Sequence, residues 1–251
     1  MQFNGFTACY CLFYCARRLH NSGRMRIRRF GTVLAAALVM ALAAAPEAKS
    51  VGGTASPDEM ALREMLEGKV GHRETWTAAP SLVIVSAVLD YERGDMATGF
   101  TALEQSLSDD DVAQLKTDLT AAMNELTGGT FKTFKTISIE AAQAGKTVKM
   151  VRPGQIVVGR FRGVQKVTGN LGYGGRLAHD STIVGGAVIL DAAFDSTSNQ
   201  RQLLRTHELG HALGYNHVES RPSVMNARVG SSITDFDRTA IRTAFDTTAQ
   251  R

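Results

Sequence analysis

Three histidines near the C-terminal end of the chain are spaced as metal ligands. The stretch reads His207-Glu208-Leu209-Gly210-His211-Ala212-Leu213-Gly214-Tyr215-Asn216-His217. Two histidines four residues apart lie on one face of a helix, one turn from each other, and can bind the same zinc ion. Gly214 follows where a left-handed residue usually ends a helix, so the chain can turn back and supply His217 as a third ligand. Three neutral imidazoles leave the fourth position for water, as a catalytic zinc site requires.

Glu208 lies beside the first of these ligands. Zinc lowers the pKa of a bound water towards about 7, and a neighbouring carboxylate can accept the proton. The stretch therefore predicts hydrolysis with Zn²⁺ as cofactor, His207, His211 and His217 as metal ligands and Glu208 as the catalytic base. Two alternatives stay open: a secreted zinc-binding module without catalytic turnover, and a secreted structural domain without metal. A purely structural zinc needs no such carboxylate, which argues against the first alternative.

The whole pattern resembles the metzincin clan of zinc endopeptidases, and within it most nearly the matrixins. The clan has a Met-turn after the third histidine, and here Ser223-Val224-Met225-Asn226 follows His217. The resemblance implies an endopeptidase acting on protein or peptide substrates. It also implies that Met225 packs beneath the zinc ligands without binding the metal.

Three further stretches carry the matrixin likeness. Gly175–His179 is similar to the edge strand of matrixins, so Leu177 and Ala178 would hold the substrate by backbone hydrogen bonds. The stretch 183–191 is similar to the strand that follows it. The stretch 233–241 is similar to the last helix, in which Asp237 would support the Met-turn backbone.

The chain departs from matrixins at their second, structural zinc. His179 matches one ligand of that site, but Ala187 and Ile189 stand where an Asp and a His are expected. One imidazole does not make a zinc site, so we expect a single catalytic zinc. Calcium is possible but has no support in the sequence.

Charge and cysteine are both concentrated in the first 50 residues. That segment holds seven basic residues and one acidic residue, whereas the other 201 residues hold 21 basic and 23 acidic ones. The body of the chain is thus slightly acidic, which excludes the basic footprint of a nucleic-acid-binding protein. All three cysteines, Cys9, Cys11 and Cys15, also lie there, so the rest of the chain cannot form a disulfide.

Residues 25–48 read as a signal peptide. Basic residues precede the uncharged 15-residue run 31–45, which is shorter than the roughly 20 residues of a membrane-spanning helix, and small residues then offer cleavage sites. We therefore expect a secreted protein, extracellular or periplasmic, with no stable membrane anchor in its mature form. Residues 1–24 are interpreted as a non-native extension, and 49–80 as a tail or short pro-like arm.

The catalytic domain is predicted to span 81–251. Strands are expected over 81–89, 131–140, 147–151, 155–161, 177–178 and 183–190, with a loop over 169–175. Helices are expected over about 57–67, 108–126, 199–213 and 234–245. The predicted fold is α+β and metzincin-like: a twisted, mostly parallel sheet with an antiparallel edge strand and two main helices, forming an upper part to about residue 214. A small lower part, 215–251, would carry the Met-turn and the last helix.

Overall fold

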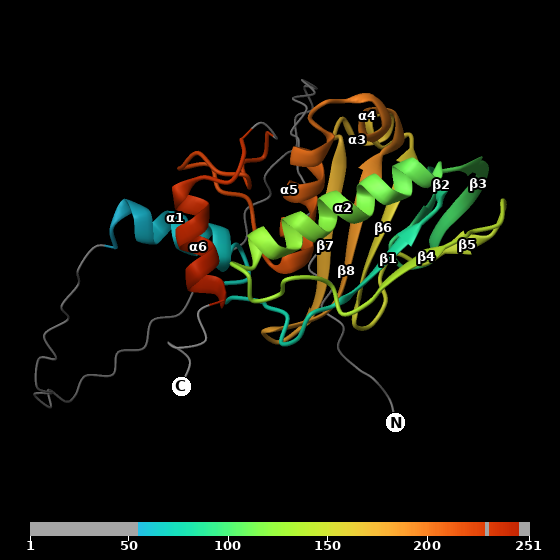
Figure 1. Cartoon of the computed structure of the whole chain (residues 1–251). Coiled ribbons are helices and arrows are strands. Elements are labelled where there is room, and N and C mark those ends of the chain that lie inside the picture. The colour runs from blue at the N-terminus through green and yellow to red at the C-terminus, as the bar shows by residue number, and fades with distance from the viewer. Residues whose placement is uncertain (1–54, 229–230, 246–251) are drawn as a thin grey trace, which may run out of the picture. The chain divides into compact units, whose positions relative to one another are not determined.

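A curled sheet of eight strands forms the centre of the computed structural model, which describes residues 55–228 and 231–245 (Figure 1). The strands are β1 (Ser81–Val85), β2 (Ala87–Asp95), β3 (Gly99–Ser106), β4 (Ile137–Glu140), β5 (Thr147–Val148), β6 (Gln155–Arg162), β7 (Gly172–His179) and β8 (Thr182–Asp191). Strand β6 lies in the middle, parallel to β1, β2 and β8, and β4 is parallel to β1. Strands β3, β5 and β7 pair antiparallel. The coarse prediction of an α+β fold with a mostly parallel sheet is confirmed.

Both faces of the central strands are buried, as their apolar sequences indicate. Successive side chains of a strand point to opposite faces. In β1, Leu82 and Ile84 therefore join the core beneath the helices, whereas Val83 and Val85 join a second core on the other face. That second core is completed by the curled strands β3 and β5, through residues such as Phe100 and Val148.

Within the described residues six helices accompany the sheet: α1 (Pro57–Leu66), α2 (Asp109–Leu126), α3 (Val164–Thr168), α4 (Ala192–Thr197), α5 (Arg201–Leu213) and α6 (Asp235–Phe245). Helices α2 and α5 contribute to the same core on one face of the sheet, and α2 runs across it in Figure 1. Ser108 caps α2 by accepting the Asp111 backbone N–H, and acidic residues fill its first turn. None of these helices is long and apolar enough to cross a membrane.

Several predicted boundaries were wrong. The strand predicted over 81–89 is divided at Ser86, because β1 pairs with β4 on the side where β2 pairs with β3. The strands predicted over 131–140 and 147–151 shrink to β4 and β5. The short helices α3 and α4 were not predicted.

The loop predicted over 169–175 was wrong from Gly172 onward, where β7 begins. Two of its glycines, Gly172 and Gly174, serve close packing against α5, whereas Gly169 ends α3 in the left-handed conformation. A Cβ on Gly174 would lie 1.9 Å from the Glu208 backbone oxygen, and one on Gly172 would lie 2.9 Å from Glu208 Oε1. Only a strand without side chains at these positions can approach α5 so closely.

The segment from Ser56 to residue 80, expected as part of a tail or pro-like arm, belongs to the same compact unit as the rest of the described chain. Helix α1 starts at Pro57 with a capping box between Ser56 and Glu59. Ala61, Met65, Leu66 and, further on, Trp76 are buried in the main core. The predicted extension, the signal peptide and the three cysteines lie outside the described residues.

Candidate metal centre

Helix α5 carries two of the three histidines and ends where the sequence predicts. His207 and His211 stand on its buried face. Gly214 ends the helix in the left-handed conformation, with φ of 116°. The position also excludes a side chain, since a Cβ there would lie 2.3 Å from the Glu74 backbone oxygen. The chain then turns back and brings His217 to the first two histidines.

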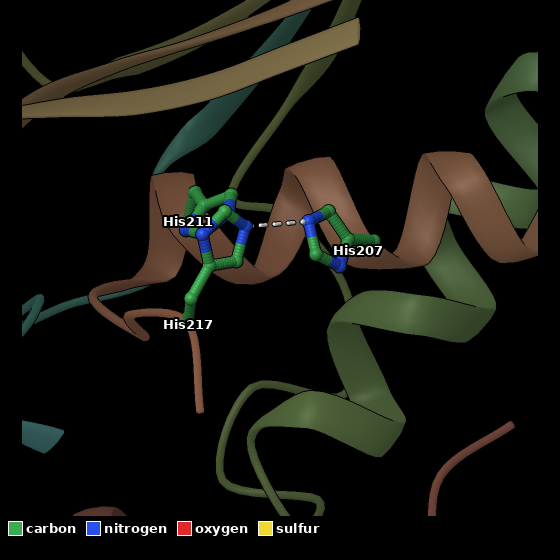
Figure 2. Close-up of side chains that lie close together, drawn as sticks. All are labelled: His207, His211 and His217. Atoms are coloured by element: carbon green, nitrogen blue, oxygen red, sulfur yellow. Dashed lines mark hydrogen bonds between the residues drawn. The ribbon is translucent and has the colours of Figure 1, made fainter. Parts of the chain in front are cut away.

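The three imidazoles converge on one point (Figure 2). Nε2 of His217 lies 3.2 Å from Nε2 of His207 and 3.0 Å from Nε2 of His211. All three candidate ligand atoms lie within 4.8 Å of one another. Tetrahedral zinc with Zn–N bonds of about 2.0–2.1 Å would hold ligand nitrogens about 3.3 Å apart. The cluster therefore has nearly the spacing of a zinc site.

Backbone carbonyls determine which nitrogens face the centre. Nδ1 of His207 lies 2.7 Å from the Val224 oxygen, and Nδ1 of His211 lies 2.9 Å from the Tyr215 oxygen. A carbonyl only accepts, so each Nδ1 carries the proton and each Nε2 presents a lone pair. His217 Nε2 has at most one proton, so it can donate to only one of these two lone pairs. A cation would satisfy all three nitrogens, and carbonyl contacts of this kind are what orient histidine ligands.

The electrostatic surroundings keep the three histidines neutral. Burial lowers the pKa of His207, and it lowers that of His217 to about 4. The pKa of His211 is lowered well below its ordinary value by burial, and further by the other two histidines and by Arg176. At neutral pH all three are therefore in the form that binds metal.

Glu208 is buried between α5 and β7. Burial raises the pKa of its carboxyl to about 8, and a hydrogen bond from the Gly174 backbone N–H opposes this only in part. A nearby cation would favour the ionised form. The carboxyl is therefore suited to exchange protons near neutral pH, the range in which a general base is effective.

In the metal-free protein, replacing Glu208 by Gln should increase the free energy of unfolding at about pH 9 but not at about pH 4. The folded-state pKa is about 8 and the ordinary value is 4.5. Between these values the folded state holds a proton that the unfolded state releases, so wild-type stability falls as pH rises through this window. Denaturant unfolding across pH measures the difference. Glu104→Gln, which replaces an exposed carboxyl, is the matched control, and equal curves for wild type and Glu208→Gln would contradict the prediction.

The stretch predicted as a Met-turn lies directly beneath α5. Met225 is fully buried, and a Cβ on Gly210 would stand 2.5 Å from its sulfur. Its neighbour Val224 supplies the carbonyl that accepts the His207 Nδ1 proton. Met225 therefore packs under the helix turn between the first two histidines.

Asp237 lies at the start of α6 and contacts this turn. Its fully buried carboxylate accepts the Val224 backbone N–H at 3.0 Å and the Thr234 backbone N–H at 2.8 Å, and it accepts the Ser223 hydroxyl as well. The carboxylate thus joins the helix cap to the turn whose carbonyl orients His207.

Asp237→Ala should therefore destabilise the protein more than Met225→Leu. The Ala variant leaves the buried Val224 N–H without an acceptor, which costs about 1–3 kcal/mol, and it also removes the acceptor of the partly buried Thr234 N–H. Leu nearly conserves the volume of Met, so Met225→Leu should cost less than about 1.5 kcal/mol. Thermal unfolding and zinc retention of both variants measure this. A silent Asp237→Ala together with zinc loss in Met225→Leu would contradict the arrangement.

The predicted substrate strand is β7, which among the described residues pairs only with β8. Leu177 and Ala178 lie opposite Gly185 and Ile183, at a shift in register. His179 follows them with 79% of its side chain exposed, next to Asp180. Ala187 and Ile189 are buried in the second core. The structure thus brings the predicted zinc ligands together and leaves His179 on the surface.

The sequence reasoning missed a buried ion-pair network just before His207. Arg205 makes a bidentate pair with Asp195 of α4, at 2.7 and 2.8 Å, and reaches Asp118 of α2 at 2.6 Å. Arg160 of β6 also pairs with Asp195. The available signal was Arg205 itself, a charged residue two positions before His207 on the helix predicted to carry the metal site. A charge in such a place needs partners, because charged side chains are rarely buried without them. The network anchors the first half of α5.

No model of a known protein family matches this chain, and no curated protein sequence matches it.

Proposed function

We propose that the protein is a secreted, zinc-dependent endopeptidase of the metzincin type, most similar to matrixins. One observation carries the proposal: three neutral imidazoles converge, two with Nδ1 fixed by backbone carbonyls, beside a buried glutamate. This donor set fits zinc, which favours nitrogen ligands and leaves a fourth position open in catalytic sites. The proposal that the protein is exported is based only on the predicted signal peptide, residues 25–48.

A zinc ion held by His207, His211 and His217 would act as a Lewis acid that polarises the scissile carbonyl and makes water more acidic. Glu208 takes the proton from the attacking water and then gives it to the leaving amine nitrogen. Peptide substrate lies extended along the open edge of β7 near Leu177 and Ala178, where backbone hydrogen bonds add it to the sheet. The buried site around Glu208 excludes bulk water from this proton transfer.

The test is a zinc measurement combined with digestion of an unstructured protein such as casein. Wild type should hold one zinc per chain and cleave internal peptide bonds. A chelator should stop cleavage, and added Zn²⁺ should restore it. Zinc binding without cleavage would favour the module without turnover, and absence of tight zinc binding would refute the proposed function.

A further inference from the structure

Arg176, on strand β7, connects three parts of the protein next to the histidines. Its Nε donates to Glu74 Oε2 at 2.6 Å, and its Nη2 donates to Asn216 Oδ1 at 3.2 Å. A third nitrogen, Nη1, lies 3.4 Å from the His211 backbone oxygen, in the last turn of α5. The side chains of Arg176 and Glu74 are only 10% and 8% exposed. A cation here also opposes the negative end of the helix dipole.

The segment from Ser56 to Trp76 makes further hydrogen bonds to the same stretch of chain. Asn216 donates both its backbone N–H and its side-chain amide to the Met65 carbonyl. Trp76 Nε1 donates to the Ala212 carbonyl at 2.9 Å. Further on, the Glu64 carboxylate accepts the Glu219 N–H and the Ser220 hydroxyl. The chain from the second histidine to just beyond the third is therefore fastened at several points by residues more than a hundred positions earlier.

We propose that Arg176 is a positioning residue for the metal centre, and that with Glu74 and Asn216 it fixes the place of His217. Asn216 directly precedes His217, so its two attachments, to Met65 and to Arg176, limit where that imidazole can go. The Arg176 contact with the last turn of α5 ties the same guanidinium to the residue that supplies the second imidazole. The inference rests on the proposed zinc site, and it makes the segment from Ser56 onward part of the site.

The several donors of the planar guanidinium are essential to this arrangement. One planar fork reaches Glu74 and Asn216 from different nitrogens, whereas a lysine ammonium is a point charge that satisfies one partner well. Arg176→Met keeps the aliphatic stem but leaves the Glu74 carboxylate buried without its partner, which is strongly unfavourable. The double variant Glu74→Gln/Arg176→Met removes both charges, so no unpaired buried charge is left to destabilise the fold.

The experiment measures Zn²⁺ affinity by competition with a chromophoric chelator, together with the visible absorption spectrum of the Co²⁺-loaded protein. Partners outside the ligand shell are worth about 10–100-fold in metal affinity. We expect Arg176→Met and the double variant to lose that much and to change the Co²⁺ spectrum, with Arg176→Lys in between. The matched control is Arg152→Met, which breaks a bidentate but more exposed pair with Glu140 of β4.

The outcomes separate this inference from the proposed function. If wild type itself binds no zinc tightly, the proposed function fails and the inference with it. If wild type binds zinc, and the double variant folds and binds it within a factor of two with an unchanged Co²⁺ spectrum, the inference alone is overturned. An equal loss in Arg152→Met would also overturn it, since the effect would then be general destabilisation.

Discussion

Replacing any one of His207, His211 or His217 by Ala should abolish tight zinc binding. Zinc-binding free energies of protein sites are on the order of 10–16 kcal/mol, and dividing this among the ligands assigns several kcal/mol to each. A loss of this size lowers affinity by about 10²–10⁴-fold. The three candidate ligand atoms lie within 4.8 Å of one another. Removing one leaves two protein ligands, fewer than the three that a catalytic zinc site uses. Zinc per chain after dialysis, with chelator competition, measures the effect.

The control for this experiment is His179→Ala. His179 is exposed on β7, and a single imidazole does not make a zinc site, so its loss should leave zinc content unchanged. Two tightly held zinc ions in wild type, one of them lost with His179, would contradict the expectation of a single site.

Glu208→Ala should keep the zinc and the fold but lose most of the peptidase activity. General acid–base catalysis contributes about 10²–10⁴-fold, and the loss should appear in kcat more than in KM because the proton moves in the transition state. Glu208→Gln should be equally inactive, since an amide of the same shape cannot take the proton. Initial rates of peptide cleavage at saturating zinc measure both variants.

Two results would remove Glu208 from the mechanism. The first is a Glu208→Ala variant within a factor of three of wild type. The second is an equal loss in Glu104→Ala, a control that removes an exposed carboxylate from β3. Full zinc content in the Glu208 variants is required, because it separates loss of the base from loss of the metal.

What the sequence predicts correctly here is local. The spacing of His207 and His211 is a property of one helix turn, and Gly214 ends that helix within the same few residues. The N-cap of α2 at Ser108 is likewise readable from neighbouring residues. For the same reason the helix boundaries at residues 109–126, 201–213 and 235–245 fall within two residues of those predicted.

What the sequence could not reveal depends on contacts between distant segments. The glycines of β7 suggest a loop until it is known that α5 lies against them. Residues 56–80 are polar enough to suggest a tail, yet Ala61 and Met65 lie one helix turn apart and are buried. Arg176 meets Glu74 across more than a hundred residues, and no local pattern encodes such a pairing.

The buried network around Arg205 also bears on how the protein comes apart. Its charges come from β6, α2, α4 and α5, and Asp195, at its centre, has no exposed surface. If one of these elements detached while the others stayed, a buried guanidinium or carboxylate would lose its partner. The free-energy cost of such an unpaired buried charge is far larger than the stability that the intact pair contributes. Partial unfolding is therefore disfavoured at this end of α5. We therefore expect α5, which bears His207 and His211, to open together with its supporting sheet in one cooperative step.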